Sequence, residues 1–100
     1  MIVVSGRIYV AAGDRETFVN ESLTSIKAAR IAQGCRDFVV APDPLESDRV
    51  NVYEEWETKE DLMAFRGAGP SADLSQLITK AEVAEYYVAT NNVPGAPDES

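Results

Sequence analysis

The stretch VNVYEEWETKEDLMAF, Val50 to Phe65, predicts a strand that runs directly into a helix, with the only tryptophan of the chain at the junction. The alternating valines and the aromatic residues are typical of a strand. Thr58, followed three residues later by Asp61, resembles a capping box and predicts the start of the helix. Trp56 is therefore either the wall of a reaction chamber or a large residue that fills a small core.

The rest of the chain adds three strands and one helix to this unit. Apolar residues alternate in the expected strands and recur at helical spacing in the expected helices. The strands are predicted at Met1–Val10, Cys35–Pro42, Arg49–Glu57 and Lys80–Ala89, and the helices at Asp14–Ala32 and from Thr58 onward. This βαββαβ order predicts the α+β ferredoxin-like arrangement, in which a four-stranded antiparallel sheet carries both helices on one face. With such a sheet and only two helices, the other face is left uncovered, and a second copy of the chain is its expected cover.

One domain accounts for nearly the whole chain. We expect it to span residues 1–90, because 100 residues are enough for a single packed core. Residues 91–100 contain turn formers and acidic residues but almost no core material, which predicts a mobile tail.

Charge and composition narrow the classes of function. The chain has 9 basic and 17 acidic residues and a net charge of −8, which disfavours nucleic acid and anionic membranes as partners. It has no histidine, which excludes Ser-His-Asp triads and histidine-containing metal sites. Cys35 is the only cysteine, so no intrachain disulfide forms. No apolar run approaches the length of a membrane helix, and the chain begins without a signal-like segment, so a cytoplasmic protein is expected.

Three short motifs carry a resemblance to a known family. The stretch QGC after the first helix, the strand ending in EEW and the helix TKEDLMAF are similar to the antibiotic biosynthesis monooxygenase domain, a branch of the dimeric α/β-barrel superfamily. The resemblance implies a homodimer with a small apolar chamber in each subunit. It also implies oxidation of an anthrone, quinol or other phenolic molecule with O2, and no metal, flavin or haem cofactor.

The sequence departs from the family pattern at two positions. Members often carry a histidine nine residues after the tryptophan, where this chain has Phe65. Members that oxidise aromatic polyketides have an asparagine on the face of the tryptophan, but here Val52 occupies that place and Asn51 points to the opposite side. A related branch degrades haem and holds the iron through a histidine, which this chain lacks.

The candidate site residues follow from these considerations. Trp56 and Asn51 are the candidate catalytic residues, and the candidate substrate-binding residues are Glu54, Phe65, Arg66 and Tyr86. No metal ligand is assigned, since the carboxylates of EEWETKED scatter over both strand faces and the helix start.

Alternative roles stay open for most of these residues. Glu54 is either a general base or the partner of an arginine, and Asn51 is either catalytic or part of a subunit interface. Of Tyr86 and Tyr87, one faces the chamber and the other the dimer interface, because they are adjacent on a strand. Two functions therefore compete: a cofactor-free monooxygenase, and a non-catalytic protein of the same fold that binds a small ligand.

Overall fold

The computed structural model describes residues 1–68 and 74–89, and the expected tail at 91–100 lies outside them. The helices and strands, in chain order, are β1 (Ile2–Val10), α1 (Arg15–Arg30), β2 (Cys35–Pro42), β3 (Arg49–Trp56), α2 (Lys59–Ala68), the short 3₁₀ helix η1 (Ser75–Leu77) and β4 (Ile78–Tyr87). The predicted βαββαβ order is confirmed, and the fold is the α+β ferredoxin-like arrangement.

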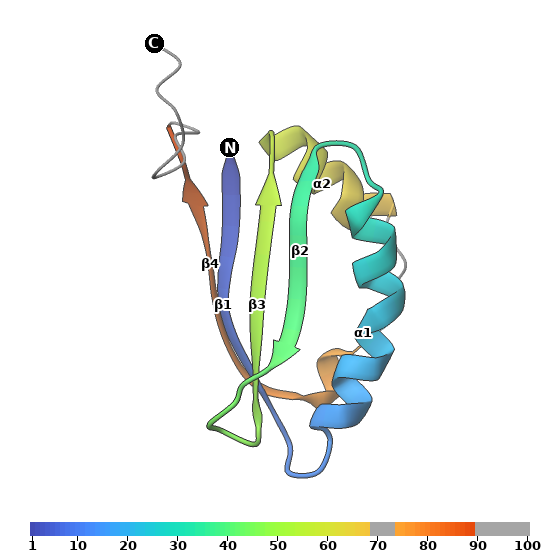
Figure 1. The fold of residues 1–100 in the computed structure, drawn as a ribbon, viewed down its shortest axis with the longest axis vertical. Helices are drawn as coiled ribbons and strands as arrows, with labels where there is room; N and C mark the ends of the chain where they lie inside the picture. The colour runs from blue at the N-terminus through green and yellow to red at the C-terminus, as the bar shows by residue number, and fades with distance from the viewer. Residues whose placement is uncertain (69–73, 90–100) are drawn as a thin grey trace.

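The four strands form one antiparallel sheet in the order β2-β3-β1-β4. Figure 1 shows α1 and α2 on the same side of this sheet, while the described part of the chain places no helix on the other side. Because β1 lies between β3 and β4, residues far apart in the sequence become neighbours. Val4 of β1, for example, is opposite Glu54 on one side and Glu85 on the other.

Local contacts explain why the elements begin and end where they do. The backbone N–H of Asp61 donates to Thr58 Oγ1 at 3.1 Å, which caps the start of α2 as the sequence predicts. Gly34, after α1, has a φ of +79°, and an added Cβ would lie 2.0 Å from Asp61 Oδ2. Glycine at this position therefore allows both the left-handed turn and the close approach of α2.

The core lies between the sheet and the helices and has two parts. One part surrounds Trp56 at the end of β3, and the other surrounds Val50 at its start. The first consists of Ile2, Val4, Ala29, Phe38, Trp56 and Leu62, and the second of Val10, Phe18 and Val50. Trp56, Leu62 and Val50 are completely buried. Within residues 1–68 and 74–89, no helix is long and apolar enough to cross a membrane.

Candidate active site

Trp56 is the last residue of β3 and lies in the core below α2. Its side chain is 0% exposed, and its ring packs against that of Phe65 with the centroids 5.3 Å apart. The indole N–H donates a hydrogen bond to Glu54 Oε1 at 2.9 Å. Both Trp56 and Glu54 point to the helix side of the sheet, since they are two residues apart on one strand. The indole therefore fills the core and at the same time holds a carboxyl group.

Glu54 is the titratable group that lies beside Trp56. Burial raises the pKa of its carboxyl, and the hydrogen bond from Trp56 and the charge of Arg66 oppose that rise in part. The negative charge of Glu85 adds to it. A carboxyl group whose pKa is raised above its ordinary value, and which is fixed by a hydrogen bond, is a candidate general base.

Two cations of α2 lie on the same side of the sheet and share one partner on β4. Arg66 Nη1 lies 2.8 Å from Glu85 Oε1, and Lys59 Nζ forms an ion pair with Glu85 Oε2. Hydrogen bonds from Lys59 and then Arg66 lower the pKa of the Glu85 carboxyl, which therefore stays ionised. These ion pairs span β1, because α2 packs over β3 while Glu85 belongs to β4.

The structure brings four of the six predicted site residues together. Trp56 contacts both Glu54, through a hydrogen bond, and Phe65, through ring packing. The positive charge of Arg66 lowers the pKa of the Glu54 carboxyl. Lys59 and Glu85 complete this group but were not predicted from the sequence. The register of β1 with β4 places Glu85 beside Val4, and nothing in the local sequence specifies that register.

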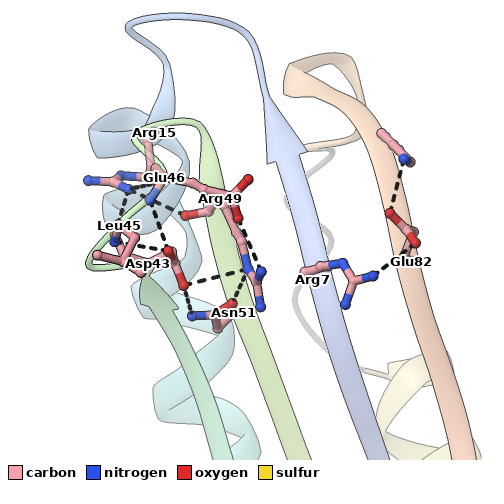
Figure 2. Close-up of polar contacts among 9 residues, drawn as sticks. Arg7, Arg15, Asp43, Leu45, Glu46, Arg49, Asn51 and Glu82 are labelled. Carbon is pink, nitrogen blue, oxygen red and sulfur yellow. Dashed lines mark hydrogen bonds and ion pairs between the residues drawn. The ribbon is translucent and has the colours of Figure 1, made fainter.

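Asn51 lies apart from this group, at the other end of β3 and on the other face. Its amide donates to Asp43 Oδ1 at 2.9 Å, and its carbonyl oxygen accepts from Arg49 Nε at 2.7 Å. Figure 2 shows it inside a network that also includes Arg15 and Glu46. This placement agrees with strand alternation, which puts Asn51 and Trp56 on opposite faces. The structure therefore does not bring the candidate catalytic residue Asn51 to Trp56.

Tyr86 also lies on the face opposite to Trp56. It is paired with Val3 on the face that no described helix covers, and its side chain is 54% exposed. Tyr87, opposite Ile2, is the tyrosine on the helix side. The candidate role of Tyr86 in substrate binding is therefore corrected: of the two tyrosines, Tyr87 lies on the face of Trp56, a choice that the sequence left open.

The only cysteine lies elsewhere and is chemically quiet. A shallow hollow of about 350 Å³ is lined by Arg30, Cys35, Arg36 and Asp37. The Cys35 thiol donates to the carbonyl oxygen of Asp37 at 3.5 Å, and burial raises its pKa. It therefore remains a protonated thiol at neutral pH. Across residues 1–68 and 74–89, no three acidic or cysteine side chains are grouped so as to hold a metal ion.

Comparison with solved structures supports the fold. The chain is similar to Rv0793 from Mycobacterium tuberculosis, with a TM-score of 0.79 and 16% identity over 92% of this chain and 98% of that one. It is also similar to a candidate antibiotic biosynthesis monooxygenase from Nitrosomonas europaea, with a TM-score of 0.78 and 15% identity over 90% and 100%. A third similar structure is the haem-degrading protein MhuD from M. tuberculosis with two haems in its active site, with a TM-score of 0.66 and 21% identity over 93% and 100%.

Sequence comparison identifies the family. Among curated proteins no sequence matches this chain. The sequence model of one family, described as antibiotic biosynthesis monooxygenase, matches residues 1–75. This match covers three quarters of the chain, including the strand that ends in Trp56 and the whole of α2. The chain therefore belongs to the antibiotic biosynthesis monooxygenase family.

Proposed function

We propose that this protein is a cofactor-independent monooxygenase that oxidises a phenolic, anthrone or quinol-like molecule with O2. The observation that carries the proposal is Glu54, a half-buried carboxyl group that accepts a hydrogen bond from the Trp56 indole, lies near Arg66 and has a pKa raised by burial. Membership in the antibiotic biosynthesis monooxygenase family supports the reaction class.

The proposed chemistry uses the carboxylate form of Glu54 as the base. It removes a proton from the acidic C–H or O–H of the substrate and leaves a delocalised anion, which transfers electrons to O2. For an anthrone, the C–H carbon gains one oxygen atom through a hydroperoxide, and loss of water gives the quinone; one O2 yields one carbonyl oxygen and one H2O. The proton on Glu54 leaves with that water. The cations of α2 stabilise the anion in a site of low polarity.

Trp56 acts in this scheme as a positioning residue. Its indole is fully buried and its N–H is already bonded to Glu54, so it orients the base and does not bond a substrate oxygen itself. Phe65 packs on the same indole and provides an aromatic wall. We assign the contact with the substrate anion to Arg66, whose side chain is 43% exposed and therefore accessible to a ligand.

The test is O2 uptake by the metal-stripped protein with a panel of anthrones, naphthols and hydroquinones. We expect uptake above the spontaneous rate, and a loss of about 100-fold or more in kcat for Glu54→Gln. Trp56→Phe should shift the pH midpoint of kcat, because the carboxyl loses a hydrogen bond that lowers its pKa. The control is Glu57→Gln. Glu57 follows the last residue of β3 and its carboxylate is exposed. Equal activity of Glu54→Gln and wild type would exclude Glu54 as the base.

A non-catalytic protein that binds a small ligand is the second candidate. The complete burial of Trp56 favours it, because a side chain that fills the core leaves no role for the indole as a chamber wall. A folded protein without O2 uptake on the whole panel would support this candidate. Haem as the ligand is disfavoured by the absence of histidine, and a haem titration without a Soret shift would exclude it.

We also propose that the chain forms a homodimer through the uncovered face of the sheet. This face mixes small apolar and aromatic side chains with an Arg7–Glu82 ion pair 3.1 Å long. Its apolar and aromatic members include Val3, Val39, Ala41, Tyr53, Ala84 and Tyr86. Sedimentation should give twice the chain mass of 10.9 kDa, and a stable monomer would contradict the dimer.

A further inference from the structure

We propose that Glu85 is a positioning residue for Glu54: it holds the guanidinium of Arg66 at β4 and so keeps it from pairing with the Glu54 carboxyl. The proposal rests on the proposed function, because it takes Glu54 as the base. It adds a role for a residue of the last strand, which acts on the base through Arg66.

Two carboxyl groups lie near Arg66, and the structure pairs it with one of them. Glu54 on β3 and Glu85 on β4 lie opposite the same residue of β1, Val4, on the helix side of the sheet. Arg66 Nη1 lies 2.8 Å from Glu85 Oε1, whereas the described residues include no ion pair between Arg66 and Glu54. The charge of Arg66 nevertheless lowers the pKa of the Glu54 carboxyl, so the guanidinium is near it. Glu85 is thus the competitor of Glu54 for Arg66.

Lys59 fixes Glu85 in the position where it holds Arg66. The two oxygens of the Glu85 carboxylate are divided between the cations: Oε1 accepts from Arg66 and Oε2 from Lys59. Lys59 and Arg66 are seven residues apart on α2, about 10 Å along its axis, so they hold the carboxylate from two points of one helix. The same hydrogen bonds lower the pKa of Glu85, while the pKa of Glu54 is raised. Glu85 is therefore already ionised where Glu54 titrates.

The nearest groups on the sheet bring no charge to Glu54. On its own strand the Trp56 indole donates to it at 2.9 Å. Its neighbours on the adjacent strands are apolar, Val4 of β1 and Phe38 of β2. Cys35 of β2 is near enough for the charge of Glu54 to raise the pKa of its thiol, which stays protonated.

Two charges act on Glu54 from other elements, and they have opposite effects. Arg66 of α2 lowers the pKa of the carboxyl, and Glu85 of β4 raises it. Arg30 of α1 instead donates to a backbone carbonyl of β2, and Tyr87, the other titratable side chain on this face of β4, is 73% exposed. Loss of Glu85 removes a charge that raises the pKa of Glu54 and frees Arg66 to pair with it. Both changes lower that pKa.

This arrangement preserves the strength of the base. A carboxylate that pairs with an arginine is a weaker base, because the ion pair stabilises its charged form. By holding the guanidinium, Glu85 leaves the Glu54 carboxylate with the single hydrogen bond from Trp56 that the structure shows. Glu85 is therefore a positioning residue and not a catalytic residue.

The experiment is an NMR titration of the full chain, labelled with ¹³C in its glutamate side chains, without any substrate. Glu54→Gln identifies the Glu54 signal by its loss. We expect Glu85→Gln to lower the midpoint of the Glu54 titration by about 1 pH unit, and Arg66→Gln to raise it. Both variants should fold, because the side chains of these ion pairs are 29–43% exposed and such pairs contribute little to stability.

Glu82→Gln is the matched control. Glu82 belongs to the same strand and also pairs with two cations, Arg7 and Lys80, at 3.1 Å each. It lies opposite Arg7 on the other face of the sheet, away from Glu54. Its loss should leave the Glu54 midpoint unchanged.

The double variant Glu85→Gln/Arg66→Gln tests whether Glu85 acts through Arg66. If it does, removing Glu85 from the Arg66→Gln variant should lower the midpoint by less than about half of the drop seen in the wild type. A drop of the same size with and without Arg66 would mean that Glu85 acts by its own charge alone, and would overturn its role as a positioning residue.

The outcomes keep this inference separate from the proposed function. A Glu54 midpoint that Glu85→Gln leaves unchanged or raises would overturn the inference, even in a protein that consumes O2. A midpoint that falls as expected, in a protein that oxidises no compound of the panel, would support the effect of Glu85 on Glu54 and refute the monooxygenase. If both proposals hold, the pH midpoint of kcat in Glu85→Gln should fall together with the NMR midpoint.

Discussion

Two groups of charged residues lie at opposite ends of β3. Each contains a carboxyl group with a shifted pKa, and the two shifts have opposite directions. The hairpin network, at the β2–β3 connection, consists of Arg15, Asp43, Glu46, Arg49 and Asn51 (Figure 2). The site cluster, at the end of β3, consists of Glu54, Lys59, Arg66 and Glu85. In the first, hydrogen bonds from Asn51 and from the backbone of Glu46 and Leu45 lower the pKa of Asp43 to about 2. In the second, burial raises the pKa of Glu54.

The difference shows that two carboxyl groups of one molecule can shift their pKa in opposite directions. Asp43 has enough N–H donors to stabilise its charge, so it stays ionised and fixes the conformation of the connection. Glu54 accepts a hydrogen bond from the Trp56 indole, but the effect of burial outweighs that bond, so its charge is costly and its pKa is raised. The number of donors around a carboxyl group, set against its burial, therefore decides the direction in which its pKa shifts.

The largest expected effect comes from Trp56→Ala, which removes the centre of the core below the site cluster. The indole is fully buried against Phe65 and Leu62, so we expect a loss of about 3–5 kcal/mol in the free energy of unfolding. Urea denaturation measures it. Trp56→Phe, which keeps an aromatic ring, should lose clearly less, and a loss below about 1 kcal/mol in the alanine variant would show that Trp56 is not a core residue.

Arg15→Met breaks the hairpin network and should have the next largest effect. One guanidinium nitrogen of Arg15 donates to the carbonyl oxygens of Asp43 at 3.0 Å and Glu46 at 2.7 Å. We expect a loss of about 1–3 kcal/mol in stability, because the part-buried carbonyl oxygen of Asp43 and the exposed one of Glu46 lose a charged donor. O2 uptake per folded molecule should not change. A fall in kcat would contradict the separation of the two regions.

The pH dependence of stability sharpens the comparison, because Asp43 and Glu54 contribute with opposite signs. The folded pKa of Asp43 is about 2 against 3.8 for the free side chain, so its contribution is present above about pH 4 and is lost as the pH falls toward 2. Asp43→Asn should flatten the stability profile in that acidic window.

Glu54 should act in the other direction. Its folded pKa lies above the ordinary value of 4.5, so the folded state holds a proton that the unfolded state has released, and stability falls as the pH rises from 4.5 to the folded pKa. Glu54→Gln should remove that fall and gain stability relative to wild type at pH values above 4.5. Denaturation at several pH values measures both slopes, and slopes of equal sign would refute the comparison.

The smallest effect on stability is expected at Leu45. This residue lies in the β2–β3 connection, but its side chain takes no part in the hairpin network. The side chain is 93% exposed, while its backbone N–H is bonded to Asp43 Oδ2 at 3.0 Å. Leu45→Ser should therefore change stability by about 0.5 kcal/mol or less. A larger loss would mean that this leucine is covered in the assembled protein, and sedimentation of the variant would detect that.

Much of the fold could be predicted because its signals are local. Alternation along Met1–Val10 and Arg49–Glu57, and the Thr58 cap, depend on residues a few positions apart. The QGC stretch, the strand ending in Glu-x-Trp and the helix that follows it together indicated the family, and the match over residues 1–75 confirms it. The side of the strand on which Glu54 and Trp56 lie also follows from alternation alone.

The sequence by itself thus determined the elements, their order and the shared face of Glu54 and Trp56, because short-range geometry fixes all three. Only the tertiary structure decided that Glu85 pairs with Lys59 and Arg66. It also decided that Tyr87, and not Tyr86, lies on the face of Trp56. Asn51 was found to bond Asp43 in the hairpin network. These facts depend on the register of β4 against β1 and on the packing of α2 across the sheet. Both are contacts between distant segments, which no local pattern encodes.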